Sequence, residues 1–182
     1  MPEILSMKSL RTAVKNGSID TVIAAFPDMQ GRLMGKRFHA KFFVDNAWQE
    51  THCCNYLIAT DLEMATVDGY ESTSWSAGYG DYVMRPDLDT LCVLPWLEGT
   101  ALVLCDLLDH HTHELVPHAP RTVLKQQLKK AEDLGLSMMA ATELEFFVFR
   151  ETFETIRDGG YHVMSPISPY NEDYHIFQTT KE

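Results

Sequence analysis

The sequence lacks the features that mark membrane, secreted and nucleic-acid-binding proteins. No window approaches the roughly 20 consecutive apolar residues that a transmembrane helix needs, and the start, MPEILSMKSL, lacks the basic-then-apolar layout of a secretory signal. Only 15 Lys and Arg stand against 26 Asp and Glu, so the formal net charge is −11 and no basic face is available for a phosphate backbone. We therefore expect a soluble, cytoplasmic protein that binds neither nucleic acid nor membranes.

Cysteine is scarce, and its spacing excludes the usual structural roles. The four cysteines are Cys53, Cys54, Cys92 and Cys105. They form no CxxC pair and no spacing that is typical of a zinc site. Adjacent cysteines are poor disulfide partners, and cysteines on apolar segments usually pack as small core residues. We expect four reduced thiols.

Apolar residues make up 45% of the chain, which is enough for one core or two small ones. Their helical spacing predicts a first helix over Glu3–Val14, ended by Asn16-Gly17. The β-prone run Thr21–Phe26, the turn residues Asp28–Gly31 and the alternating segment Arg32–His39 predict a β-hairpin. The second strand of this hairpin carries basic residues on one face.

The middle of the chain combines an irregular stretch with short strands. Phe42–Gln49 is compatible with a helix or with an irregular cover of the core. Asp68–Asp81 is rich in Gly, Ser, Tyr and Trp without a period, which predicts a long loop. Pro, Asp and Gly turns then separate three predicted strands, at Tyr82–Arg85, Thr90–Leu94 and Thr100–Cys105.

The last third begins with a polar, histidine-rich stretch from Asp109 to His118. Pro120 is suited to the first turn of a helix, and Gly135 is suited to its end. The apolar face of this helix is predicted to contain Leu124, Leu128 and Ala131. Leu136–Phe149 is so apolar and aromatic that it predicts a central, buried strand. The order of elements suggests an α+β protein of two units, divided near the histidine-rich stretch.

Two carboxylates in the last predicted strand are the strongest chemical signal. Side chains alternate along a strand, so Glu143 and Glu145 project to the same face about 7 Å apart. Two buried carboxylates repel each other and are costly to desolvate, so a positive group should face them. The candidates are a protein cation such as Lys36 or Arg37, and one or two divalent metal ions. The alternative is that the strand end is solvated and both glutamates face water.

Four motifs along nearly the whole chain resemble the glutamine synthetase family. The first is Thr142–Phe149, which resembles the strand whose two glutamates, one residue apart, ligate the metal ions of that family. Asp28–Arg37 resembles the hairpin near the start of the family's N-terminal domain, and Gly80–Asp87 resembles its "SDMxLxPD"-type stretch. Pro120-Arg121 matches the entry into the catalytic domain. The resemblance implies a β-grasp-like N-terminal domain over residues 1–109 and the start of the catalytic α+β domain over residues 110–182.

The resemblance also implies an activity and its cofactors. Family members use ATP to phosphorylate the γ-carboxylate of glutamate, and ammonia or an amine then displaces the phosphate. Mg²⁺ or Mn²⁺ neutralises charge on the phosphoryl oxygens, and Glu145 and Glu143 would each hold one ion. Family members form homo-oligomeric rings with active sites between subunits, so we expect a ring in the full-length protein.

The nitrogen donor is the open point of this resemblance. In the family, an N-terminal loop offers an aspartate that helps to deprotonate ammonium, and Asp68 is the nearest match. The chain reads DGYEST from Asp68, where the ammonia-using enzymes read DGSS, so both ammonia and a primary amine such as a polyamine stay open. Glu71 and Asp81 are competing acids. Tyr161, after Gly159-Gly160, resembles a tyrosine near the ammonium pocket.

Further ligands of the family's active site lie beyond the matched motifs. They include more glutamates, a histidine and arginines that bind ATP and glutamate. We therefore expect the 182-residue chain by itself to lack ligase activity. A different possibility is a naturally short β-grasp protein that uses the family's surfaces only for assembly or regulation, although buried glutamates without partners would be a liability there.

Overall fold

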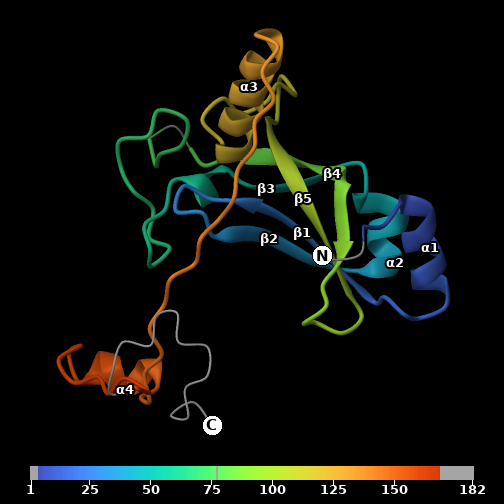
Figure 1. The fold of residues 1–182 in the computed structure, drawn as a ribbon. Helices are drawn as coiled ribbons and strands as arrows, with labels where there is room; N and C mark the ends of the chain where they lie inside the picture. The colour runs from blue at the N-terminus through green and yellow to red at the C-terminus, as the bar shows by residue number, and fades with distance from the viewer. Residues whose placement is uncertain (1–3, 77, 169–182) are drawn as a thin grey trace. The chain divides into compact units, whose positions relative to one another are not determined.

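The computed structural model describes residues 4–76 and 78–168, which divide into two compact units (Figure 1). The first unit extends to Met138 and contains a five-stranded sheet with helices, and the second begins at Met139 and contains one short helix. The observed class is therefore a mixed sheet with few helices. None of the helices in the described ranges is long and apolar enough to span a membrane.

Helix α1, Met7–Lys15, starts four residues later than the sequence predicts. The Ser6 side chain caps it by accepting a hydrogen bond from the Ser9 N–H at 3.1 Å. Leu5 is instead held beside the sheet, because its N–H donates to the Leu91 carbonyl at 2.8 Å. Leu10 is fully buried, and Gly17 follows the helix with a φ of 79°, so the predicted helix end is confirmed.

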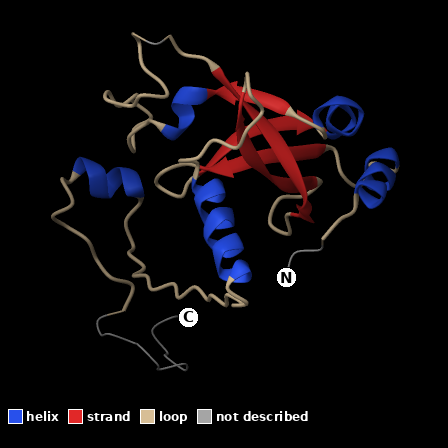
Figure 2. Cartoon of the chain, turned by 90° about the horizontal axis from the view of Figure 1, so that it is seen from above, coloured by secondary structure: helices blue, strands red, loops and turns tan. Residues whose placement is uncertain are grey.

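The five strands have the order β2-β1-β5-β4-β3 (Figure 2). All neighbours are antiparallel except the central pair, β1 and β5, which run parallel from the Thr21–Thr100 partners onward. The predicted hairpin of β1 and β2 is confirmed. The strands are β1 (Thr21–Pro27), β2 (Leu33–His39), β3 (Thr51–Cys54), β4 (Asp81–Val93) and β5 (Thr100–Asp109).

The three interior strands β1, β5 and β4 all contribute buried side chains to the core. The ambiguous stretch after β2 forms a short helix α2, Ala40–Phe42, which continues as a π-helical turn η1, Phe43–Ala47. Both lie next to α1 at one end of the sheet (Figure 1, Figure 2). The fully buried Phe43 joins their packing to the same core as Leu10. The 3₁₀ turn η2, Asn55–Ile58, follows β3.

The sequence prediction of two separate strands over residues 82–94 is wrong, because β4 is one strand with a bulge between Asp87 and Cys92. Pro86 reads as a turn residue, yet it is tolerated within β4 since β3 pairs with β4 only as far as Met84. At the bulge, the Thr90 hydroxyl accepts from the Leu104 N–H at 2.9 Å and donates to the Asp87 carbonyl at 2.7 Å. The side chain of Thr90 thus replaces the missing ladder contact.

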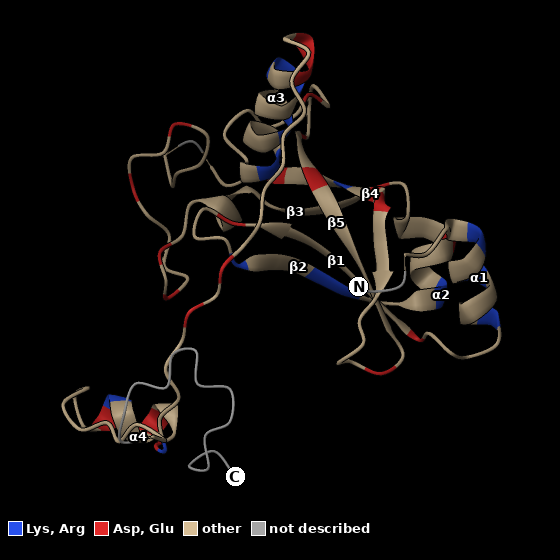
Figure 3. Cartoon of the chain, in the orientation of Figure 1, with Lys and Arg blue, Asp and Glu red and all other residues tan. Residues whose placement is uncertain are grey.

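Helix α3, Pro120–Asp133, has the predicted start and end, but its packing differs from the prediction. Leu124 and Leu128 are exposed, so the predicted apolar face is not part of the core of this unit. Its buried residue is Thr122, on another side of the helix. Ion pairs of Arg121 and Lys125 with Asp87 of β4 and Asp106 of β5 hold the helix to the sheet. Figure 3 shows basic positions on α3 and acidic positions on the strands beside it.

The prediction of a buried strand over Leu136–Phe149 is wrong for this structure. Residues 139–148 are extended but belong to no strand, and large side chains such as Met139 (96%) and Phe147 (79%) are exposed. A strand needs a hydrogen-bonded neighbour, and within the described residues only a bridge of Phe149 to Pro166 lies next to this segment. The segment is apolar, but an apolar composition alone does not provide a neighbouring strand with which it can pair.

The second unit contains the short helix α4, Phe153–Asp158. The Thr152 side chain caps it by accepting from the Thr155 N–H at 3.3 Å. Beside it, the Arg150 N–H donates to the Ser165 carbonyl at 3.0 Å, and Ile156 is the buried residue of the helix. These contacts tie residues 148–167 into a small fold of their own.

Candidate functional site

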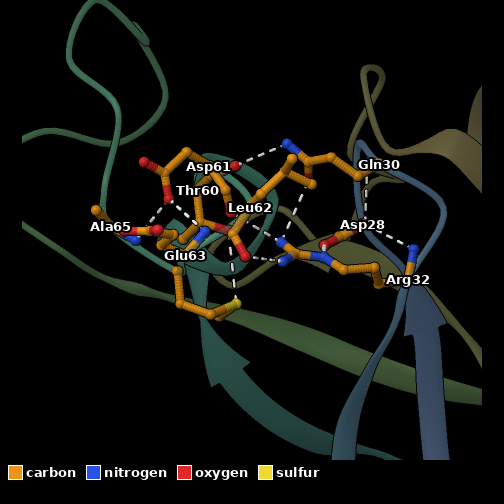
Figure 4. Close-up of polar contacts among 9 residues, drawn as sticks. Asp28, Gln30, Arg32, Thr60, Asp61, Leu62, Glu63 and Ala65 are labelled. Atoms are coloured by element: carbon orange, nitrogen blue, oxygen red, sulfur yellow. Dashed lines mark hydrogen bonds and ion pairs between the residues drawn. The ribbon is translucent and has the colours of Figure 1, made fainter. Parts of the chain in front are cut away.

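The loop between η2 and β4 begins with a small closed structure over residues 59–67. The Val67 N–H donates to the Ala59 carbonyl at 2.9 Å, and Thr60 forms a bridge with Thr66. At the tip, the Asp61 carboxylate accepts the N–H groups of Glu63 and Ala65, both at 2.9 Å. We call residues 59–67 the closed loop (Figure 4).

Side chains of the β1–β2 turn bind one arm of the closed loop (Figure 4). The Arg32 guanidinium donates to the Leu62 carbonyl at 2.8 Å and to the Asp61 carbonyl at 3.0 Å. The Gln30 side-chain amide donates to the Thr60 carbonyl at 2.9 Å. Three successive carbonyls therefore receive side-chain donors from one turn, so the closed loop is fixed to the edge of the sheet.

Asp28 organises the turn that carries these donors. Its carboxylate accepts from the Gln30 N–H at 2.9 Å, the Arg32 N–H at 2.8 Å and the Arg32 Nε at 2.7 Å. Asp28 is only 1% exposed, and this burial alone would raise its pKa. The hydrogen bonds and the charge of Arg32 outweigh it and hold the pKa of Asp28 below its usual value. The carboxylate is thus charged at neutral pH and orients Arg32.

Asn55, the first residue of η2, binds the far part of the same long loop. Its side-chain amide donates to the Ser72 carbonyl at 3.2 Å. Its side-chain oxygen accepts from the Thr73 hydroxyl at 2.9 Å and from the Gly80 N–H at 3.3 Å. Because Asn55 and Thr73 are buried, water competes little for these bonds.

Asp68 lies between the two anchored parts of this loop. It follows Val67, the residue that completes the closed loop, and it is exposed. Gly69 then takes a φ of 95°, a left-handed conformation that favours glycine. The candidate Glu71 is also exposed and precedes Ser72, the first residue bound by Asn55. The segment Asp68–Glu71 is therefore short, solvent-facing and held on both sides.

Asp81, the other candidate acid of this region, has a different setting. It is the first residue of β4, where it pairs with Cys54 of β3, and its side chain is exposed. Asp81 is held by strand pairing, whereas Asp68 follows a closed loop whose carbonyls are bound by side chains of the β1–β2 turn. The predicted long loop is confirmed by the described part of residues 68–80, and the sequence placed Asp68 and Asp81 at its two ends.

The predicted metal ligands, Glu143 and Glu145, lie in the second unit on the extended segment that forms no strand. Both are exposed, and neither forms a hydrogen bond or ion pair with another residue in the described ranges. Over residues 4–76 and 78–168, no three His, Cys, Asp or Glu side chains gather closely enough to hold a metal ion. The two carboxylates are thus available as oxygen donors, without a third ligand beside them in this part of the chain.

Tyr161 lies just after α4, also in the second unit. It has a φ of 62°, uncommon for a residue with a side chain, and it is 65% exposed. Its N–H donates to the Ile156 carbonyl at 3.0 Å, which closes the turn at the end of α4. The Gly159-Gly160 pair therefore presents an aromatic side chain to solvent.

Comparisons with known proteins assign the chain to a family. Residues 117–181 match the family described as glutamine synthetase, catalytic domain. Over 176 residues the chain is 47% identical to the γ-glutamylethanolamide synthetase GlnA4 of Streptomyces coelicolor, covering 96% of this chain and 38% of that protein. The chain belongs to the glutamine synthetase family. The resemblance stated from the four motifs is thereby confirmed.

Two further relatives show the range of this family. The chain is 34% identical to a glutamate–isopropylamine ligase of a Pseudomonas species, over 91% of this chain and 36% of that protein. It is 25% identical to a glutamine synthetase of Thermotoga maritima, over 92% of this chain and 37% of that protein. The chain thus spans less than two fifths of the length of these relatives.

Sequence reasoning missed the two residues that hold the Asp68 segment of this glutamine synthetase family chain. Arg32 was noted only as part of a basic strand, although the local pattern of an acid at position 28 and an arginine four residues later was visible. Asn55 gave no signal, because its partners are 17 to 25 positions away and two of them are backbone groups.

Proposed function

We propose that this chain serves an ATP-dependent ligase that joins an amine to the γ-carboxylate of glutamate through a γ-glutamyl phosphate. The observation that supports this proposal is how the sequence identity of this chain differs from one relative to another. Among three relatives that match over 91% or more of this chain, the identity is 47% and 34% to the proteins named for ethanolamide and isopropylamine, and 25% to a glutamine synthetase. An amine is therefore a better supported donor than ammonia.

The proposal includes the domain division expected from the motifs. Residues 1–109 form a β-grasp-like N-terminal domain, and residues 110–182 begin the catalytic domain, in keeping with the family match over residues 117–181. The complete enzyme is a homo-oligomeric ring with its active sites between subunits, so Asp68 of one subunit serves the site of another.

Glu143 and Glu145 are proposed to hold the divalent ions that accompany ATP. Their chemistry fits, because both are exposed carboxylates with no cation of the described residues beside them, and carboxylate oxygens are preferred by Mg²⁺ and Mn²⁺. When bound, such an ion neutralises charge on the phosphoryl oxygens of ATP during transfer. If the segment pairs as a strand in the complete enzyme, the alternation of side chains would put both glutamates on one face.

Asp68 is proposed as the group that accepts a proton from the ammonium form of the donor. Removal of this proton leaves a nitrogen lone pair, which attacks the γ-carbonyl carbon of the acyl phosphate while phosphate leaves. Tyr161 is proposed to line the donor pocket. Glu71 and Asp81 are the alternative acids, and the exposure of all three allows each to reach a substrate.

A donor screen on the product of the complete open reading frame tests the function. The enzyme is incubated with ATP, glutamate and either ethanolamine, isopropylamine, a polyamine or ammonia, and the products are identified by mass. We expect a γ-glutamylamide of at least one amine, formed faster than glutamine. Turnover of ammonia alone would show a glutamine synthetase, and no product with any donor would support a non-catalytic assembly module.

A matched pair of variants tests the metal ligands in the same protein. Glu143→Gln combined with Glu145→Gln should abolish Mn²⁺-dependent turnover, because an amide is a much weaker ligand than a carboxylate. Glu154→Gln, an exposed acid on α4, should retain it. Unchanged Mn²⁺ activation in the double variant would exclude the two glutamates as ligands.

A further inference from the structure

We propose that Arg32 and Asn55 are positioning residues for the nitrogen-donor site, because they fix the two sides of the segment Asp68–Glu71. This inference rests on the proposed function of Asp68 and deepens it. Neither side chain has to touch the substrate. Each acts by determining where the acidic segment lies relative to the sheet.

The first side of the segment is fixed by the clamp at Arg32 (Figure 4). Its guanidinium binds two carbonyls of the closed loop at 2.8 and 3.0 Å, while its Nε binds the buried Asp28 at 2.7 Å. Because Asp28 is held charged, it keeps the guanidinium plane in one orientation. A lysine has a single point of charge and cannot bind three acceptors in this fork-like geometry.

The closed loop transmits this position to Asp68 over a short distance. Arg32 binds the arm at residues 61 and 62, and the bridge of Thr60 with Thr66 and the bond of Val67 to Ala59 hold the two arms together. Asp68 is the next residue along the chain. One rotatable backbone unit therefore separates the candidate acid from a structure that is hydrogen-bonded to the sheet.

The second side of the segment is fixed by Asn55, independently of Arg32. One buried amide binds Ser72, Thr73 and Gly80, so the chain after Glu71 is also tied to the sheet through η2. Loss of either clamp leaves the segment held at one side only. The expected consequence is a wider range of Asp68 positions, which weakens use of the donor but leaves ATP binding intact.

The test uses the complete enzyme and measures two quantities. In the Arg32→Gln variant, hydrogen exchange of the Glu63, Ala65 and Val67 amides should be at least 10-fold faster than in the wild type. The KM for the amine should rise at least 10-fold, while the KM for ATP changes less than 2-fold. Asn55→Ala should likewise raise the KM for the amine and leave the KM for ATP unchanged. Its faster hydrogen exchange should appear around residues 72–73 instead.

Two further variants separate positioning from a general loss of folding. Met29→Ala changes an exposed side chain of the same turn that makes none of the clamp bonds, and it should leave both exchange and KM values unchanged. Arg32→Lys keeps a positive charge for Asp28 and should fold, yet it should show the same rise in the amine KM. If Arg32→Lys instead restores the wild-type amine KM, charge alone suffices and the positioning role is wrong.

Hydrogen exchange and the amine KM can each contradict the inference separately. Unchanged exchange in Arg32→Gln would show that the clamp does not hold the loop and would overturn the inference. Faster exchange with an unchanged amine KM would show a structural clamp without a role in donor use, and would also overturn it. If the wild-type enzyme forms no product with any nitrogen donor, the proposed function is refuted. The hydrogen-exchange measurement would still decide whether Arg32 holds the closed loop.

Discussion

Arg121 on α3 donates from its Nε to Asp106 on β5 at 3.0 Å, and this pair joins a helix to a sheet that it otherwise contacts little. Lys125 donates to the same carboxylate at 2.6 Å. Asp106 is therefore the acceptor for two cations from one helix, while its own side chain is only 8% exposed. Four predictions follow from this pair and from other local features of the unit that ends at Met138.

Replacing Asp106 with Asn should destabilise this unit by about 2 kcal/mol, because two cations lose the charge of their common partner. The measurement is urea unfolding of the purified protein, followed by circular dichroism. Asp89→Asn, at an exposed position on β4, is the matched control and should change the free energy of unfolding by less than about 0.5 kcal/mol. Equal effects of the two substitutions would contradict a special role for Asp106.

The stabilisation by Asp106 should disappear in acid. Burial alone would raise its pKa, but hydrogen bonds and charges from Lys125 and Arg121 outweigh this and lower it. A lowered folded-state pKa means that the stabilisation is fully present above the unfolded value of about 4 and is lost as the pH falls through the folded value. The difference in unfolding free energy between wild type and Asp106→Asn should therefore shrink between pH 5 and pH 2. A constant difference over this range would rule out the linkage.

Gly35 and Gly31, both in the β1–β2 hairpin, should respond differently to alanine. A Cβ on Gly35 would lie 2.0 Å from the Ala24 carbonyl oxygen, so the strands would have to separate. Gly31 has open space around it, and only its left-handed φ of 81° opposes a side chain. We expect Gly35→Ala to cost at least about 2 kcal/mol and Gly31→Ala about 1 kcal/mol, measured by thermal unfolding. The reverse order would show that the hairpin geometry is different.

The thiols should differ sharply in reactivity in the folded protein. Burial raises the pKa of Cys53 and Cys105 to about 12, and that of Cys92 is also raised by burial, so these thiols hold little thiolate at pH 8. Cys54 is only half-buried. Brief treatment with iodoacetamide, mapped by fragmentation mass spectrometry, should therefore modify Cys54 first. Cys54→Ser should remove the fast reaction, and rapid labelling of Cys53 in that variant would contradict the burial.

The sequence predicted those parts of the fold that depend on neighbouring residues. The β1–β2 hairpin is specified by turn residues between two β-prone runs, and α3 by Pro120 and Gly135, so both were found. Pro86 misled the prediction, since its effect depends on where β3 stops pairing with β4. The parallel pairing of β1 with β5 has no local signal, because it joins distant segments.

The candidate site was predictable to a similar extent. Asp68 was identified from a motif, and its loop from composition, but the residues that hold it act through backbone carbonyls, which carry no sequence signature. For Leu136–Phe149, the apolar content led to the prediction of a buried strand, whereas the structure leaves large side chains such as Met139 and Phe147 exposed. Apolar content does not specify a neighbour, and in the described residues the segment has no strand to pair with.

The parallel pair at the centre of the sheet also has a kinetic consequence. The β1–β2 and β4–β5 hairpins each close over a short stretch of chain, whereas Thr21 meets Thr100 only after about 80 residues have been brought together. Such a closure costs chain entropy before any contact compensates for it, and non-local pairing slows folding. We therefore expect the two hairpins to form early and their union through β1 and β5 to limit the folding rate.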